Sequence, residues 1–264
     1  MTAVSFDRMA VAYDTFMGRW TRVFMPSLLR AAAIAPGQRV LDLATGTAES
    51  ALLLAGALEP GGSVVGADIS WPMLQKARAK LDGRPIRLIA ANGQALACRA
   101  AVFDRVVCQL GLMFFPDPVA GVREARRVLR PGGRFAALVW SVSERVPWLS
   151  LLGREVVQYL PERRDEVFMG TSLADPGRLQ RVLVEAGLRD VCVTTETRSM
   201  EFTSFDDYWS HVQSGAIRIG ALLGELPAKT AEAIRDRVRA ATSTFAVGDR
   251  LVMPTDVLVA AGST

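Results

Sequence analysis

The sequence is poor in the residues that build metal centres and disulfide frameworks. It has one histidine and three cysteines, Cys98, Cys108 and Cys192, which lie far apart in the chain. An odd, scattered set of cysteines excludes a disulfide-stapled domain and a cysteine–histidine zinc site. Such cysteines are typical of reduced thiols in a cytosolic protein, so we expect no metal ion and a cytoplasmic location.

Long apolar runs are absent as well. No stretch approaches the roughly 20 apolar residues that cross a bilayer as a helix. Residues 1–30 also carry several charged side chains, which a signal or transit peptide would not tolerate in this arrangement. The sequence therefore predicts no membrane span.

The chain has little excess charge of either sign. Its net charge is +4, and its arginines are interspersed with acidic residues. Arg123, Arg126, Arg127 and Arg130 share the outer face of one predicted helix, where solvation explains them. Because no basic and aromatic platform accompanies them, we expect a small-molecule partner and no nucleic acid.

What the sequence does contain is a strand, a tight turn of small residues and a helix. The segment reads Arg39-Val-Leu-Asp-Leu-Ala-Thr-Gly-Thr-Ala-Glu-Ser50, with an apolar run typical of a buried parallel strand. A pyrophosphate-binding turn has the pattern G-x-G-x-x-G, whereas this turn has a single glycine, Gly46. The turn therefore favours a nucleoside ligand without a phosphate to bind.

A second apolar strand, residues 62–68, ends in another carboxylate. Asp68 follows Asp42 by 26 positions, which is the place where nucleoside-binding sheets hold an acid for the ribose hydroxyls. Ser70 then has the position of a helix N-cap, and Met73 lies on the inner stripe of the predicted helix.

The remaining pattern predicts a Rossmann-like, doubly wound α/β fold with a seven-stranded, mostly parallel sheet and a helical lid insertion. A chain of 264 residues with 50% apolar content can bury the core of such a domain. We expect residues 1–202 and 247–264 to form the cofactor-binding domain and residues 203–246 the lid. Further helices are expected at 5–34 (part of the lid, interrupted at 18–22), 117–130 and 175–186. Further strands are expected at 86–90, 103–109, 134–141 (after a Pro-Gly-Gly turn), 191–197 and 250–260, with an irregular insertion at 144–170.

With these elements in place, the chain resembles the class I S-adenosylmethionine-dependent methyltransferases. Their first motif is V-L-D-x-G-x-G-x-G, and residues 40–48 match it with alanine in place of two glycines. Residues 68–74 match the family signature D-x-S-x-x-M-L. Residues 103–117 are similar to the segment F-D-x-V-x-x-Q-x-G-L-M-F-F-P-D of the ubiquinone/menaquinone-biosynthesis-like (type 11) group.

This resemblance implies a set of residues that bind S-adenosylmethionine. Ile69 and Met73 would sandwich the adenine, and Asn92, which replaces a family aspartate, would accept from its amino group. An element before the first strand, Y-D-x-x-M-G-R-W-x-R, would close over the methionine end. The expected cofactor-binding residues are Tyr13, Trp20, Arg22, Ala44, Thr45, Gly46, Asp68, Ile69, Met73, Asn92, Gly93, Gln94 and Gln109.

The predicted function is methyl transfer from S-adenosylmethionine to a small, partly apolar molecule. An activated sulfonium donor needs orientation and exclusion of water more than a protein nucleophile, and none stands out in the first half of the sequence. Two alternatives stay open: a cofactor-binding enzyme with other chemistry, such as a cyclisation, and a non-catalytic ligand-binding protein.

The lone histidine, His211, is the candidate catalytic residue. It lies in a predicted lid helix three positions after Tyr208, so both side chains share one flank. An imidazole that titrates near neutrality suits the removal of a proton from an acceptor hydroxyl. A structurally hydrogen-bonded histidine is the alternative interpretation.

Overall fold

The computed structural model describes residues 10–215 and 217–264, without the side chains of residues 10–17, 19, 214, 215 and 217. These residues form an eight-stranded sheet in the order β3-β2-β1-β4-β5-β8-β6, with β7 paired to β8. Strands β1 to β5 are parallel, whereas β8 is antiparallel to β5 and β6. The predicted α/β fold is confirmed, and the strand beyond the expected seven is the two-residue β7. The strands are β1 (Arg39–Leu43), β2 (Ser63–Asp68), β3 (Ile86–Ala90), β4 (Phe103–Gln109), β5 (Leu129–Trp140), β6 (Arg189–Phe202), β7 (Ala246–Val247) and β8 (Arg250–Ser263).

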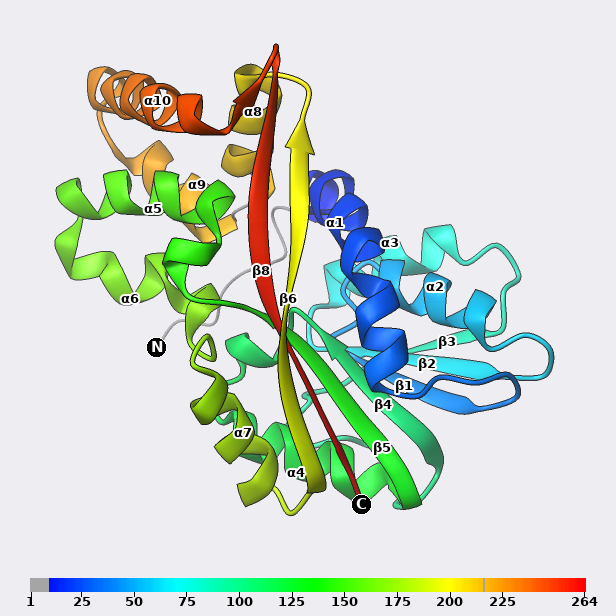
Figure 1. The fold of residues 1–264 in the computed structure, drawn as a ribbon. Coiled ribbons are helices and arrows are strands. Elements are labelled where there is room, and N and C mark those ends of the chain that lie inside the picture. Colours follow the sequence, from blue (N-terminus) through cyan, green and yellow to red (C-terminus); the bar gives the residue numbers. More distant parts are fainter. Residues whose placement is uncertain (1–9, 216) are drawn as a thin grey trace.

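Helices cover both faces of the sheet (Figure 1). Helices α1 (Ala10–Ala31), α2 (Glu49–Ala57) and α3 (Trp71–Lys80) lie on one side of β1–β3, and α4 (Pro118–Val128) and α7 (Pro176–Glu185) lie on the other side of the sheet. The remaining helices gather around the far half of β6 and β8, at the upper left of Figure 1. They are α5 (Pro147–Tyr159), α6 (Arg164–Val167), α8 (Phe205–Gly215), α9 (Ile217–Glu225) and α10 (Ala228–Thr242). We call this group the cap; the division of the chain into a domain and a lid stays a prediction.

Three helices on the sheet begin at the side-chain caps that the sequence contains. Ser70, Asp117 and Asp175 each accept the backbone N–H of the residue three positions later, at 3.4, 3.0 and 2.5 Å. A proline follows each cap within two positions, where its missing N–H costs nothing. These local signals explain why the predicted helix starts are close to the observed ones.

Long strands β6 and β8 hold the cap on the sheet. Their pairing runs from Arg189↔Ser263 to Phe202↔Leu251, whereas β5 pairs with β8 only as far as Trp140↔Val257. The far ends of β6 and β8 therefore project beyond β5, and the cap helices surround this projection (Figure 1). Among the described residues, no helix combines the length and apolarity that crossing a bilayer requires.

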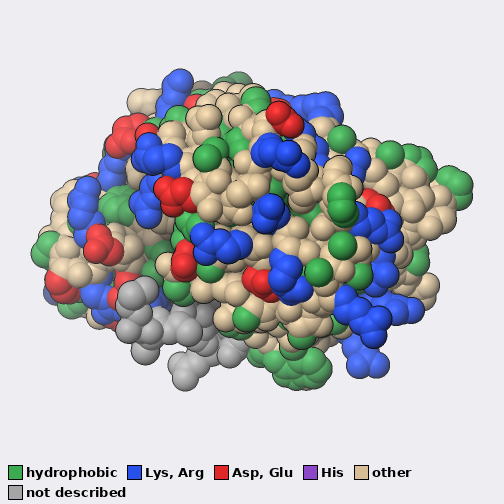
Figure 2. All heavy atoms as spheres, turned by 90° about the horizontal axis from the view of Figure 1, so that it is seen from below, with side chains coloured by type: hydrophobic (Ala, Val, Ile, Leu, Met, Phe, Trp, Pro, Cys, Tyr) green, Lys and Arg blue, Asp and Glu red, His purple; other side chains and the backbone are tan. Residues whose placement is uncertain are grey.

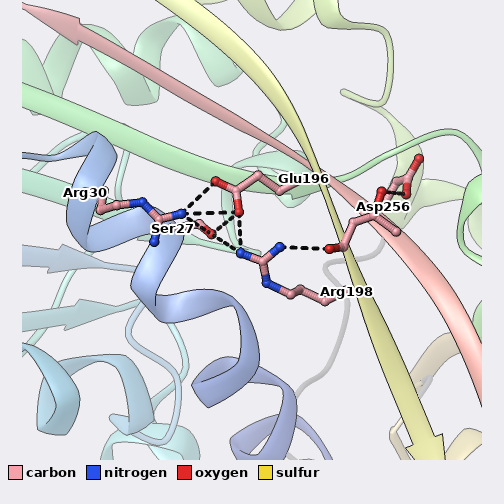
Figure 3. Close-up of polar contacts among 6 residues, drawn as sticks. Ser27, Arg30, Glu196, Arg198 and Asp256 are labelled. Atoms are coloured by element: carbon pink, nitrogen blue, oxygen red, sulfur yellow. Dashed lines mark hydrogen bonds and ion pairs between the residues drawn. The ribbon is translucent and has the colours of Figure 1, made fainter.

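A polar network fixes α1 to the edge strand β6 (Figure 3). The carboxylate of Glu196 accepts the hydroxyl of Ser27, and it pairs with Arg30 at 3.1 Å and with Arg198 at 2.8 Å. On the neighbouring strand, Asp256 pairs with Arg145 at 3.1 Å. Because Glu196 meets two guanidinium groups and a hydroxyl, the C-terminal half of α1 is held against the sheet.

Three predictions about local structure were wrong. Helix α1 is continuous through Gly18, since this glycine lets α1 approach Glu49, whose Cγ would lie 3.1 Å from an added Cβ. The insertion at 144–170 is mainly helical, because Trp148, Leu152 and Val156 recur at four-residue spacing and are buried. The Pro-Gly-Gly element is an irregularity inside β5 and not a turn before it, since Leu129 already pairs with Phe103.

Candidate functional site

A pocket of about 240 Å³ opens at the carboxyl ends of β1, β2 and β4. This is the edge of a parallel sheet where ligands bind in doubly wound folds. Nine of the predicted cofactor-binding residues line it: Ala44, Gly46, Asp68, Ile69, Met73, Asn92, Gly93, Gln94 and Gln109. The structure therefore brings together most of the predicted set, although their roles stay predictions.

Four other predicted residues do not line this pocket. The Trp20 ring is buried against Phe202, with ring centroids 5.4 Å apart, and Arg22 pairs with Glu49 at 3.2 Å. Thr45 turns its side chain inward over Gly66, where a larger residue would collide with it. His211 lies on α8 outside the pocket lining. The side chain of Tyr13 lies outside the described residues.

The turn after β1 is organised by a buried acid, Asp42. Its Oδ2 accepts the hydroxyls of Thr45 at 2.5 Å and Ser50 at 2.6 Å, while its Oδ1 has no hydrogen-bond partner among the described residues. Burial raises the pKa of Asp42 from 3.8 to about 6, although the two hydroxyls lower it. The sequence contains this acid, but its role as the anchor of the turn becomes evident only from these contacts.

Asp68 connects this turn to the next strand. Its Oδ2 accepts the backbone N–H of Gly46 and its Oδ1 that of Ser70, both at 2.8 Å. Burial raises the pKa of Asp68 above its ordinary value, and the amide hydrogen bonds oppose that rise. Each carboxylate oxygen keeps a further lone pair, so the group can still accept two hydroxyls from the pocket.

An apolar slot lies beside Asp68. Ile69 lines the pocket with 72% of its surface exposed, whereas Met73, which also lines it, is buried. An exposed isoleucine next to a pocket is the side chain that a planar apolar ligand would cover. This arrangement fits an adenine ring between the two residues.

The turn after β3 forms another wall of the pocket. Asn92 Oδ1 accepts the N–H of Gln94 at 2.9 Å, and Gln94 Oε1 accepts the N–H of Asp117 at 3.0 Å. Gly93 makes room for Phe115, whose Cζ would lie 2.5 Å from an added Cβ. The side-chain oxygen of Asn92 thus has one lone pair committed to the turn and one left for a ligand.

Gln109 connects the end of β4 to α1. Its Nε2 donates to the carbonyl of Thr21 at 3.1 Å, while its buried Oε1 has no partner among the described residues. A buried acceptor without a donor costs free energy until something donates to it. Because Gln109 lines the pocket, a ligand ammonium or hydroxyl group is the partner that suits this oxygen.

The segment after β4 contributes pocket residues that the sequence reasoning placed nearby but did not name. They are Leu110, Gly111, Phe114, Phe115 and Pro116. Gly121 and Gly93 both face the Phe115 ring, so two glycines make room for this side chain. No cluster of three metal-ligating side chains occurs within the described part of the chain.

Ala44 and Gly111 form a complementary pair across the pocket floor. Ala44 has a left-handed backbone with φ 60°, a conformation that favours glycine, and an added Cβ on Gly111 would overlap the Cβ of Ala44. The methyl group of Ala44 therefore occupies space that a side chain at position 111 would need, and Gly111 leaves that space open.

We expect Gly111→Ala to lower the free energy of unfolding by about 2 kcal/mol, since overpacking a fixed core costs this much. Adding Ala44→Gly removes the opposing methyl and should restore most of the loss. Urea unfolding of the wild type, both single variants and the double variant measures the coupling. Gly56→Ala is the control, because an added Cβ there meets nothing within 4 Å. A double variant as unstable as Gly111→Ala would contradict the pairing.

Comparison with known proteins decides the family. Residues 5–152, more than half of the chain, match the ubiE/COQ5 methyltransferase family. The chain belongs to this family. The match contains every element of the pocket and ends inside α5, so most of the cap lies beyond it.

Individual relatives of this ubiE/COQ5 family member agree with that placement. A demethylmenaquinone methyltransferase of Thermus thermophilus is 40% identical over 122 residues, which cover 46% of the chain and 53% of the relative. An uncharacterised protein of Mycobacterium tuberculosis is 39% identical over 44% of the chain and 42% of its own length. The chain thus spans about half the length of these curated relatives.

Solved structures show the fold alone, since their identity to the chain is low. A phosphoethanolamine N-methyltransferase 2 of Haemonchus contortus, in complex with phosphomonomethylethanolamine and S-adenosylhomocysteine, has a TM-score of 0.61 at 17% identity. The alignment covers 98% of this chain and 57% of that one.

Proposed function

We propose that this protein transfers a methyl group from S-adenosylmethionine to a small, partly apolar acceptor. One observation carries the proposal: the half-buried carboxylate of Asp68 stands beside the exposed Ile69 and the Gly46 turn at the carboxyl ends of the strands. A ribose with two hydroxyls and an attached flat base fits such an acid with an apolar slot next to it.

The donors and acceptors along the pocket fit the rest of the cofactor. Asp68 would hold the ribose, and Ile69 with Met73 the adenine. Beyond the Gly46 turn, the partnerless Oε1 of Gln109 suits the ammonium group of the methionine part. Bound there, S-adenosylmethionine supplies a methyl group on a positively charged sulfur, which is already activated for displacement.

The chain itself has to orient the acceptor and exclude water. Transfer breaks the sulfur–methyl bond while the acceptor–methyl bond forms, and an acceptor hydroxyl gives up its proton. Leu110, Phe114 and Phe115 give the pocket an apolar lining. Such a lining keeps water from competing with the acceptor. Proximity and orientation can then supply much of the rate enhancement.

His211 is the proposed proton acceptor. Its Nδ1 contacts the carbonyl of Asp207 at 2.6 Å and the carboxylate of Asp207 at 2.9 Å. An imidazole held in this way by an acid is oriented, and the positive charge that it would gain with the proton is stabilised. Its position on α8, outside the lining of the pocket, requires the acceptor to extend from the cofactor toward the cap.

A reduced quinone is the first acceptor class to test, because a Thermus thermophilus relative is a demethylmenaquinone methyltransferase. Such an acceptor can take the methyl group on a ring carbon or on a hydroxyl oxygen, and the accepting atom then gives up its proton. The cap surrounds the acceptor side in this proposal, and most of it lies beyond residue 152, where the family match ends. The acceptor of this chain can therefore differ from that of its relatives. We further propose that the protein acts in the cytoplasm, which its three free cysteines support. We also propose that it binds no nucleic acid, which its small net charge of +4 supports.

The test is a turnover screen with S-adenosylmethionine and small aromatic hydroxyl compounds, followed by mass spectrometry. We expect one acceptor to gain 14 Da while S-adenosylhomocysteine forms in equal amount. Cofactor binding without transfer to any acceptor would favour the ligand-binding alternative, and a product formed without a mass gain would favour other chemistry such as cyclisation.

A further inference from the structure

A second hollow lies at the opposite, amino-terminal end of β1, β2 and β3. It has a volume of about 430 Å³ and is lined by three arginines, Arg39, Arg84 and Arg87, together with Ser63 and Val65. Neither the proposed transfer reaction nor the cofactor pocket uses any of these residues. Three guanidinium groups around one hollow are a feature that neither role explains.

The strand register places two of the arginines, Arg39 and Arg87, on one face. Arg39 of β1 is level with Ser63 of β2, and Arg87 of β3 is level with Val65. Ser63 and Val65 are two residues apart, so both point to the same side of β2. The two arginines thus flank β2, about 10 Å apart across the strands and about 7 Å apart along them, with Ser63 and Val65 between them.

This face is open because a helix is missing from it. Arg105 and Arg134 lie level with Val40. Arg134 donates to the carbonyl of Ala31 in α1, and Arg105 donates to that of Ala33 in the turn after α1. Because Arg39 is the neighbour of Val40, it points to the face opposite α1. The connection between β3 and β4, residues 91–102, contains no helix, so it leaves the amino end of β2 uncovered there.

The charge of the three arginines is not neutralised within the described part of the chain. Arg39, Arg84 and Arg87 have no ion pair there, and all three are exposed. The carboxylate of Asp104 accepts the backbone N–H of Arg39 at 2.7 Å, and its other oxygen accepts the guanidinium of Arg130 at 2.6 Å. Figure 2, which views this side of the molecule, shows more blue than red side chains over its right part, where β1–β3 lie.

We propose that this hollow binds a phosphate group. Guanidinium groups form paired, charge-assisted hydrogen bonds with phosphate oxygens, and three of them around one hollow attract the negative charge that every phosphate group carries. The Arg39 guanidinium carbon lies 5.3 Å from the centre of the Phe103 ring on β4, which fixes this arginine at the β4 side of the hollow. The ligand would be a small phosphorylated molecule or the headgroup of an anionic phospholipid.

The test is calorimetry with inorganic pyrophosphate at low salt, with the cofactor pocket saturated by S-adenosylhomocysteine. We expect the wild type to bind one pyrophosphate and the Arg84→Gln/Arg87→Gln variant to bind at least about 30-fold more weakly. Arg178→Gln, which removes an exposed arginine on α7, is the matched control and should change affinity less than about twofold. Absence of binding to the wild type, or equal weakening by the control, would overturn the site.

Two further measurements separate the sources of the phosphate. Sedimentation with phosphatidylcholine vesicles containing phosphatidylglycerol, lost in the double variant, identifies a lipid headgroup; pyrophosphate binding without vesicle binding identifies a soluble ligand. Because the hollow and the pocket lie at opposite ends of the strands, the double variant should bind S-adenosylhomocysteine like the wild type. Pyrophosphate binding can therefore fail while cofactor binding and methyl transfer are intact, and the reverse also holds.

Discussion

Replacing Asp68 with alanine is expected to weaken S-adenosylhomocysteine binding about 30- to 1000-fold. The carboxylate is half-buried, and two ribose hydroxyls would donate to it at about 1.5–3 kcal/mol each, with incomplete additivity. A loss of about 2–4 kcal/mol corresponds to that change in the dissociation constant. Isothermal titration calorimetry with the wild type and the variant measures it.

The control for this result is Glu144→Ala, which removes an exposed carboxylate that pairs with Arg154 far from the pocket. It should leave the affinity unchanged. Since Asp68 also accepts from Gly46 and Ser70, thermal unfolding of the variant must show that it is still folded. A folded Asp68→Ala chain with wild-type affinity would remove the acid from the cofactor site.

The second large effect concerns stability and pH at Asp42. Burial raises its pKa from 3.8 to about 6, so the folded chain binds this proton more tightly than the unfolded chain does. The resulting stabilisation is complete below pH 3.8 and is lost as the pH rises through about 6. The full difference is about 3 kcal/mol. Asp42→Asn cannot ionise, so its stability relative to the wild type should grow by about that amount between pH 4 and pH 7.

Urea unfolding at several pH values measures both chains. Ser50→Ala provides a comparison in the opposite direction, because the Ser50 hydroxyl lowers the pKa of Asp42. Its removal should raise that pKa further and enlarge the loss of stability with rising pH. A pH-independent difference between Asp42→Asn and the wild type would show that Asp42 titrates at its ordinary pKa.

Local patterns predicted those parts of the fold that local interactions determine. The buried strand before Ala44, the caps at Ser70 and Asp117 and the carboxylate at Asp68 each have their cause within a few residues of sequence. Parallel strands then bring these segments to one edge, which is why nine predicted residues line a single pocket.

Features that depend on distant contacts could not be predicted in this way. Gly18 suggested a break in α1, but it is required by the approach of Glu49 from α2. Thr45 faces Gly66 and Asp42 and not the pocket, and Arg22 pairs with Glu49. Gly18, Thr45 and Arg22 each meet a residue that lies 21 to 31 positions away, so their conformations follow from tertiary packing.

The alanine at position 44 illustrates the same limit. In the sequence it is a departure from the family's glycine, whereas in the structure Gly111 supplies the missing space 67 positions later. Arg39 and Arg87 of the amino-terminal hollow are likewise 48 positions apart, and only the register of β1–β3 brings them to one face.

The most direct test of the central claim is a crystal structure of the chain with S-adenosylhomocysteine. The proposal predicts the ribose hydroxyls on Asp68, the adenine between Ile69 and Met73, and the amino acid part beside Gly46 and Gln109. A ligand bound elsewhere, or a pocket that stays empty in crystals grown with saturating ligand, would contradict the assignment of this pocket as the cofactor site.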